Sequence, residues 1–256
     1  MRILWLLVSL IFSANAQLIA KPNAQTIVDR YTERNALGIH IGEANLSMLI
    51  RDRKGREKNR EMTLQVFENS EERANLLRVM EPSELKGTTL LFREQRKVDQ
   101  SQMHLFLPQA GKPRRIGDNQ KKSPFVASDF TFGDLDSSYL NGAALKLLGS
   151  HKVDQNDCYE IEVLPKQNTI AKRIVLYIRK DSYLAEAIKY YDTKNQLYKV
   201  FKLIKSEKTG DQWLARQSQM WNKKTGSVTA VKITKIDAKA KLQIELFTPE
   251  RMTRAL

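Results

Sequence analysis

The side chains of this chain that could do chemistry are few, and the densest group is acidic. Asp129, Asp134 and Asp136 lie close together in the stretch DFTFGDLDSSYL. Carboxylates at such spacing can bind Ca²⁺, but an EF-hand loop needs acidic residues at its positions 1, 3 and 5 and a glutamate at position 12. This stretch has threonine, glycine and leucine at positions 3, 5 and 12. We therefore expect no metal site here, and carboxylates that cap turns or accept hydrogen bonds from backbone N–H groups.

Histidine and cysteine give no better basis for catalysis. His40, His104 and His151 are far apart in the sequence, and none lies in an H-x-x-x-H or H-E-x-x-H arrangement. The chain also has no P-loop, G-x-G-x-x-G or G-x-S-x-G motif. Cys158 has no activating histidine or cation cluster beside it, so we predict a small buried apolar residue in a strand. The sequence predicts a protein that is not an enzyme and that needs no metal or cofactor.

Aromatic side chains are the remaining candidates for a binding site. Trp213 and Trp221 have the same parity in one predicted strand, and Met220 has the opposite parity. An aromatic residue on a sheet either fills the core or contacts a ligand. The sequence leaves both interpretations open for these three residues, which we retain as candidate lipid contacts.

The elements that must position these residues are mostly strands. Ala24, Ile27, Val28 and Tyr31 have helical spacing and predict a short amphipathic helix within residues 22–36, with Asn23 as its N-cap. Beyond it the apolar period changes to two, and turns rich in Gly, Asn, Asp and Lys separate the runs. The expected strands, about eleven of them in antiparallel order, include residues 44–50, 62–66, 73–80, 87–93, 100–107, 174–178, 183–191, 197–205, 213–221, 227–236 and 241–247.

A large antiparallel sheet with so few helices cannot cover its apolar face with helices alone. It can close into a barrel or curl around the helices that it has. A curled sheet that a helix fills only in part leaves an apolar cavity, and cavities of this kind in β-barrels hold apolar ligands. No linker rich in Ser, Gly or Pro divides the chain, so we expect a single domain over residues 17–256.

The first sixteen residues predict export. Arg2 precedes an apolar run from Ile3 to Phe12, and Ala14 and Ala16 form an A-x-A cleavage pattern. This order is typical of a secretory signal peptide over residues 1–16 that is cleaved after Ala16. The apolar run is shorter than the roughly 20 residues that a membrane-spanning helix needs. We therefore expect a soluble, exported mature protein.

The chain is strongly basic, with a formal net charge of +14 at pH 7. In a cytoplasmic protein this charge would suggest nucleic acid, but the predicted signal peptide argues against that partner. The Lys and Arg residues are scattered along the alternating patterns, which is typical of a solvated face. Their field can also attract anionic lipid head groups, and we therefore allow transient contact with a membrane surface, or an acidic partner.

An ordered set of motifs resembles one known family. These motifs are LLRVMEPSELKGTTLLF (76–92), MHLFLPQAGKPRRI (103–116), FVASDFTFGDL (125–135), YLAEAIKYYDTKNQLYKVFKL (183–203), QMWNKKTGSVTAVKI (219–233) and LFTPERM (246–252). Together they resemble the LolA-like outer membrane lipoprotein-sorting proteins of Gram-negative periplasms. The resemblance extends from about residue 40 to residue 256.

The resemblance implies a mainly β fold: a curved, half-open antiparallel β-barrel with a few helices across its concave face. It implies a periplasmic carrier that holds the acyl chains of a lipid or acylated lipoprotein in an apolar cavity and passes them between envelope components. The alternative is a non-enzymatic accessory or sensor subunit that docks on an inner-membrane exporter complex of the RND type.

Within that fold, the stretch after the Ser-Pro turn signal acquires a role. We expect Phe125, Phe130 and Phe132 to anchor a loop or short helical lid over the concave face and to contact lipid. Ser128 and Asp129 would satisfy backbone donors of this loop, as an N-cap does.

Overall fold

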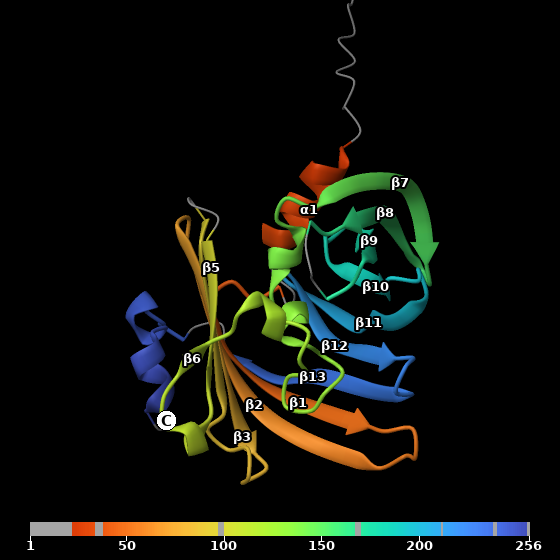
Figure 1. Cartoon of the computed structure of the whole chain (residues 1–256). Helices are drawn as coiled ribbons and strands as arrows, with labels where there is room; N and C mark the ends of the chain where they lie inside the picture. The colour runs from red at the N-terminus through yellow and green to blue at the C-terminus, as the bar shows by residue number, and fades with distance from the viewer. Residues whose placement is uncertain are drawn as a thin grey trace, which may run out of the picture.

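The computed structural model describes residues 22–33, 38–96, 100–166, 170–210, 212–237 and 240–254 (Figure 1). The predicted signal peptide and its cleavage site after Ala16 lie outside these ranges. Within them, no helix combines the length and apolar character needed to cross a membrane.

The sheet is single, open and curved, as predicted (Figure 1). Within the described residues the sheet has thirteen strands in the order β6-β5-β4-β3-β2-β1-β13-β12-β11-β10-β9-β8-β7, and neighbouring strands pair antiparallel. The strands are β1 (Gly42–Arg51), β2 (Glu57–Glu68), β3 (Glu72–Glu81), β4 (Thr89–Gln95), β5 (Gln100–Phe106), β6 (Arg114–Arg115), β7 (Ala144–Val153), β8 (Asn156–Leu164), β9 (Arg173–Arg179), β10 (Ala185–Tyr191), β11 (Leu197–Thr209), β12 (Gln212–Asn222) and β13 (Ser227–Asp237).

The topology sends one long connection across the open side of the sheet. Strands β1 to β6 step outward in sequence order to one edge, and β7 to β13 step inward from the opposite edge until β13 pairs with β1. The chain must therefore cross from one edge to the other between β6 and β7. Residues 116–143 make this crossing inside the curve of the sheet (Figure 1), and we refer to them as the crossing segment. It contains the 3₁₀ turns η3 (Asp118–Gln120), η4 (Phe132–Asp134) and η5 (Ser137–Leu140).

The helix α1 (Ala24–Glu33) also lies on the open side, beside β7 (Figure 1). The predicted N-cap is confirmed, because the Thr26 backbone N–H donates to the side-chain oxygen of Asn23 at 2.8 Å. Ile27 and Val28 are buried in the main core. The helix thus uses its apolar stripe to close one end of the curved sheet.

The main core lies on the concave face. It takes the alternate residues of the central strands, such as Leu46 and Met48 of β1 and Met62 and Leu64 of β2, together with Phe125, Phe130 and Phe132 of the crossing segment. A second, smaller cluster lies on the opposite face of β3 and β4 and contains Ala74, Leu76 and Leu91. Alternation along a strand explains both clusters, since neighbouring residues point to opposite faces.

The C-terminal segment covers that second cluster, and here one prediction was wrong. Residues 241–247 were expected to form a strand, but the chain forms the 3₁₀ turns η6 (Ile244–Leu246) and η7 (Pro249–Thr253). Phe247 and Met252 are buried in the second cluster, and the C-terminal segment that carries them lies outside β5 and β6 in Figure 1. Apolar burial therefore explains the pattern that suggested a strand, while Pro249 has no N–H with which to join a ladder.

The strand count also differs from the expected number of about eleven. The sequence pattern did not identify β7 and β8 as strands. β7 lies at the edge of the sheet and is mostly exposed, so its alternation of apolar and polar residues is weak.

Candidate functional site

The concave face and the crossing segment enclose an apolar cavity of about 220 Å³. Its lining comes from α1, from both halves of the sheet and from the crossing segment. The lining residues are Tyr31, Thr32, Leu46, Met48, Met62, Leu64, Val66, Arg73, Asn75, Leu77, Leu90, Phe92, Phe125, Phe130, Asp134, Leu135, Asp136, Tyr139, Leu184, Ala185, Ile188, Tyr190, Phe201, Leu203, Ala215, Ser218, Met220 and Val231. Most of these side chains are apolar, which is typical of sites for apolar ligands.

A second hollow of about 330 Å³ adjoins the cavity. Phe125 lines both spaces, and the second one is otherwise lined by residues such as Leu105, Leu107, Arg114 and Phe132. Phe125 is 1% exposed and packs edge-on against Phe132, with ring centroids 6.0 Å apart. Phe125 therefore lies where the two hollows approach each other.

The turn that carries Phe125 has an unusual backbone. Val126 and Ala127 have φ angles of 43° and 60°, a region that a β-branched residue such as valine rarely adopts. The turn is held on both sides, because the Phe125 N–H donates to the Phe130 carbonyl at 2.8 Å and the Ser128 N–H donates to the Phe125 carbonyl at 2.9 Å. These bonds hold the backbone from which the Phe125 ring projects.

Polar contacts tie the crossing segment to the sheet behind it. Both carboxylate oxygens of Asp129 accept hydrogen bonds from β13, one from the hydroxyl of Ser227 and the other from that of Thr229. The Thr229 hydroxyl also accepts the Asp129 backbone N–H at 2.9 Å. Ser128 acts within the turn itself, since its hydroxyl accepts the Phe130 backbone N–H at 3.2 Å.

A buried ion pair makes a second tie. The Lys199 ammonium of β11 donates to Asp134 Oδ2 at 2.6 Å, and the two side chains are 3% and 2% exposed. The same carboxylate oxygen caps η4 by accepting the backbone N–H and the hydroxyl of Thr131, each at 2.7 Å. Asp136 pairs with Lys121 at 2.9 Å within the crossing segment. Two of the three clustered aspartates thus make ion pairs with lysines.

Three tyrosines surround Asp134 in the cavity wall. Burial, the largest cause, raises the pKa of Tyr31 and raises those of Tyr139 and Tyr190 well above the ordinary value. All three phenols therefore stay protonated at neutral pH. The Lys199 ammonium also lies 4.6 Å from the centroid of the Tyr190 ring, which gives it a cation–π contact in addition to its carboxylate.

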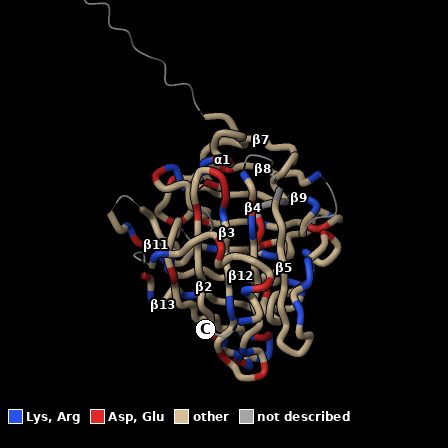
Figure 2. The backbone as a smooth tube through the Cα atoms, turned by 90° about the vertical axis from the view of Figure 1, so that its left-hand side faces the viewer, with Lys and Arg blue, Asp and Glu red and all other residues tan. Residues whose placement is uncertain are grey.

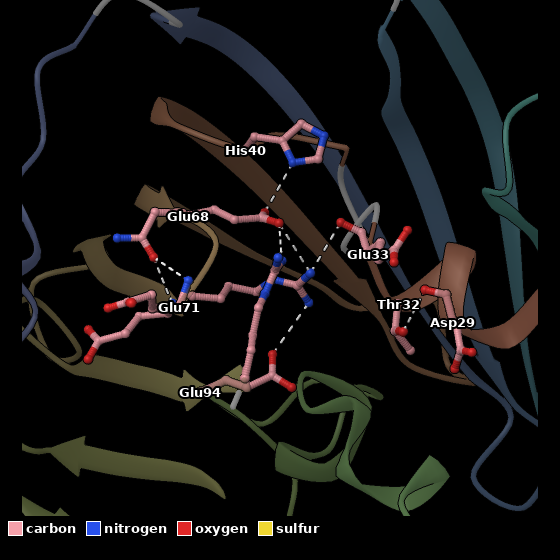
Figure 3. A network of polar contacts seen from close by, with 11 residues as sticks. Asp29, Thr32, Glu33, His40, Glu68, Glu71 and Glu94 are labelled. Carbon is pink, nitrogen blue, oxygen red and sulfur yellow. Dashed lines mark hydrogen bonds and ion pairs between the residues drawn. The ribbon is translucent and has the colours of Figure 1, made fainter. Parts of the chain in front are cut away.

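Where α1 approaches β2, β3 and β4, the polar network in Figure 3 borders the cavity. Arg73 donates to the Glu33 carbonyl at 3.1 Å and lies 3.5 Å from Glu68 and 3.6 Å from Glu94. Glu68 also pairs with Arg96, and with His40 at 3.1 Å. Arg73 thereby connects the end of α1 to the sheet.

The charge state of Glu68 follows from these contacts. Burial by itself would raise the pKa of this carboxyl group, but the hydrogen bond from His40 and the charges of Arg73 and Arg96 outweigh burial and lower it. Glu68 is therefore ionised at neutral pH and balances the arginines.

Four of the six aromatic or methionine candidates lie at these hollows. Phe125, Phe130 and Met220 line the cavity and Phe132 lines the second hollow. Trp213 packs instead with Leu184, Leu203 and Ala215 and stacks on Arg179, 4.6 Å from its ring centroid. Trp221, partly buried in β12, is not among the residues that line either hollow.

A break in strand register explains why parity misleads for the tryptophans. The pairing of β11 with β12 shifts between Leu203 and Ser206, and Ala215 and Ser218 both line the cavity although they have opposite parity. Equal parity therefore does not place Trp213 and Trp221 on one face. Irregularities of this kind reverse the alternation of side chains beyond them.

The polar wall of the cavity was missed in the sequence. Arg73 and Asn75 follow the parity of Leu77 in β3, so a polar pair on an otherwise apolar face was a usable signal. No sequence signal pointed to Tyr139 or Lys199 as parts of this wall, because only the fold brings their side chains to Asp134.

Metal ligands and a reactive thiol are two features that catalysis could use. The described residues contain no cluster of three His, Cys, Asp or Glu residues that could hold a metal ion. Cys158 is buried in β8, and burial, with a smaller contribution from Glu186, raises the pKa of its thiol to about 11. A thiol with this pKa is a poor nucleophile at neutral pH.

The charges do not form a single basic patch in the view of Figure 2. Lys and Arg are interspersed there with Asp and Glu over the strands. On this side of the molecule the positive charge is therefore distributed among acidic residues.

Comparison with known proteins identifies a family and a fold. A family model described as uncharacterized-protein-like matches residues 71–254, whereas no functionally curated protein matches the chain. A solved DUF1329 family protein from Desulfovibrio piger is 23% identical, with a TM-score of 0.77 over 91% of this chain and 100% of that one.

Two further solved structures share the architecture. One is a domain from Vibrio parahaemolyticus described as an outer membrane lipoprotein-sorting protein, 22% identical, with a TM-score of 0.80 over 91% of this chain and 98% of that chain. The other is a LolA superfamily protein from Nitrosomonas europaea, 15% identical, with a TM-score of 0.69 over 90% and 99% of the two chains. The fold is therefore LolA-like.

Proposed function

Since this chain belongs to the family whose model matches residues 71–254 and has a LolA-like fold, we propose that it is a non-enzymatic periplasmic carrier. It holds acyl chains of a lipid or acylated lipoprotein in the apolar cavity and passes them between envelope components. The cavity between the concave face and the crossing segment is the observation that carries this proposal. The lipoprotein-sorting description of the Vibrio parahaemolyticus relative supports it.

Burial of hydrocarbon supplies the driving force for binding. Each CH₂ group that leaves water contributes about 0.8 kcal/mol, so a chain of ~14 carbons supplies roughly 11 kcal/mol before ordering costs. Binding of this kind is not directional. A carrier can therefore accept chains of different structure and release them to a partner or a membrane with an equally apolar site.

The size of the cavity indicates how a long chain would fit. Pockets for drug-sized ligands usually measure about 300–1,000 Å³, and the cavity measures about 220 Å³. A long acyl chain therefore requires more room than the cavity alone provides. Rotation of the Phe125 ring would join the cavity to the second hollow of about 330 Å³, so we expect this ring to move when a chain binds.

A cavity-filling substitution tests the carrier function. Ala185 lines the cavity, so Ala185→Phe should occupy it and weaken the binding of N-phenylnaphthylamine, a neutral and apolar fluorescent dye, at least tenfold. Ala144 is exposed at the start of β7, and Ala144→Phe is the matched control that should bind as the wild type does. Equal affinity in both folded variants would contradict a lipid site in this cavity.

Native mass spectrometry of protein purified from the periplasm separates the carrier from the alternative function. Co-purified lipid that Ala185→Phe fails to retain supports the carrier. A ligand-free protein that co-purifies with an inner-membrane RND-type exporter supports the accessory or sensor subunit instead.

A further inference from the structure

The cavity wall contains polar atoms that lack hydrogen-bond partners. Six such buried side-chain atoms occur among the described residues, and three of them belong to residues that line the cavity. They are Arg73 Nε, Asn75 Oδ1 and Asp134 Oδ1. Buried polar groups are nearly always paired in native proteins, so each exception calls for an explanation.

Two of the three atoms are close neighbours along the chain. Arg73 and Asn75 are alternate residues of β3 and both line the cavity, so their side chains leave the same face of the strand about 7 Å apart. Arg73 is 5% exposed, and its terminal nitrogens already contact Glu33, Glu68 and Glu94. Its Nε–H donor is what remains for another molecule.

The charges in this wall are already balanced within the protein. Arg73 lies near Glu68 and Glu94, Asp134 pairs with Lys199, and Asp136 pairs with Lys121. An ionised head group would therefore meet no uncompensated charge of opposite sign and would lose its hydration. The unpaired atoms are one N–H donor and two oxygen acceptors, which suit a group that both accepts and donates hydrogen bonds.

We propose that the cavity selects neutral lipids that carry a hydroxyl or amide group, and that this group binds at Arg73 and Asn75. The group accepts the Arg73 Nε–H and donates to Asn75 Oδ1, while the hydrocarbon lies against the apolar wall. This inference rests on the proposed carrier function and defines its ligand class. Neither an ionised fatty acid nor a plain hydrocarbon satisfies both atoms.

Three ligands with the same hydrocarbon chain length test the selectivity. Dodecanol, dodecanoate and dodecane compete with N-phenylnaphthylamine for the wild-type protein at pH 8. One satisfied hydrogen bond corresponds to about tenfold in affinity. We therefore expect dodecanol to displace the dye at a concentration about tenfold lower than either dodecane or dodecanoate.

The variant Asn75→Leu removes the acceptor with little change in side-chain size. It should reduce the dodecanol affinity to that of dodecane while the dodecane affinity stays the same or rises, a split that general destabilisation would not produce. Asn59 is exposed on β2, and Asn59→Leu is the matched control that should keep the preference for dodecanol.

The outcomes distinguish this inference from the proposed function. If all three ligands bind the wild type equally, or dodecanoate binds best, the selectivity is refuted and the carrier function stands. If none of them displaces the dye, the carrier function itself fails. If Asn75→Leu still prefers dodecanol, the hydroxyl group does not bind at Asn75, and this part of the proposal is refuted.

Discussion

Removing one partner of the buried pair between Asp134 and Lys199 should cost far more stability than removing one partner of an exposed ion pair. Lys199→Met removes the ammonium but keeps an unbranched apolar side chain. Asp134 would then be a buried carboxyl group, 2% exposed, with no ammonium partner and with one oxygen that has no hydrogen-bond partner. Removing one partner of a buried ion pair typically costs about 3–5 kcal/mol, because the other charge stays buried and uncompensated.

An exposed pair of equal length provides the control. Arg51 and Glu57 are also 2.6 Å apart, but their side chains are 58% and 44% exposed. Exposed pairs contribute about 0–1 kcal/mol, so Arg51→Met should change stability little. The double variant Asp134→Asn/Lys199→Met should recover most of the loss, because the amide oxygen can still accept the hydrogen bonds from Thr131 and no charge remains.

Urea denaturation at pH 7 measures the free energy of unfolding of the wild type and of each of the three variants by linear extrapolation. A loss of 3–5 kcal/mol corresponds to a fall in Tm of roughly 6–20 °C in a protein of this size. The reasoning is refuted if Lys199→Met costs no more than Arg51→Met, or if the double variant is less stable than Lys199→Met alone. Either result would mean that burial does not govern the energy of this pair.

Two further predictions follow from the pKa shifts of Glu68 and Cys158. The pKa of Glu68 is lowered in the folded protein, so its carboxylate stabilises the fold above the unfolded-state pKa of about 4.3, and this contribution is lost as the pH falls through the folded pKa. Glu68→Gln should therefore be less stable than the wild type at pH 7 and should approach it near pH 3; a urea midpoint difference that does not vary with pH would contradict this. The Cys158 thiol has a pKa of about 11 and is buried, so it should react slowly with Ellman's reagent at pH 8 in the native protein and rapidly in urea, and rapid native reaction would show that the thiol is accessible.

Local sequence patterns predicted the elements whose signals are local. Asn23 caps α1 as expected, because an N-cap depends only on a side chain and the backbone three residues later. The alternation in residues 44–50 and 62–66 predicted β1 and β2, whose apolar faces are buried. The pattern wrongly predicted a strand at residues 241–247. Apolar residues in this stretch pack against the outer face of the sheet without pairing as a strand.

The candidate site was predictable only where its residues lie in one stretch. Phe125, Phe130 and Phe132 stood out as an aromatic group and lie together at the two hollows. Trp213 and Trp221 could not be assigned, because the register shift between β11 and β12 leaves no mark in the sequence that alternation alone would reveal.

The sequence by itself determined a chain of amphipathic strands with too few helices to cover them, and this imbalance requires a curved sheet with an apolar interior. Only the tertiary structure decided what lines that interior. Because β1 pairs with β13, β6 and β7 lie at opposite edges of the sheet, and the crossing segment must span the open side between them. The crossing brings Asp134 to Lys199. It also encloses the cavity that Arg73 and Asn75 line. These contacts join residues far apart in the chain, so their partners are chosen by topology and register rather than by local sequence.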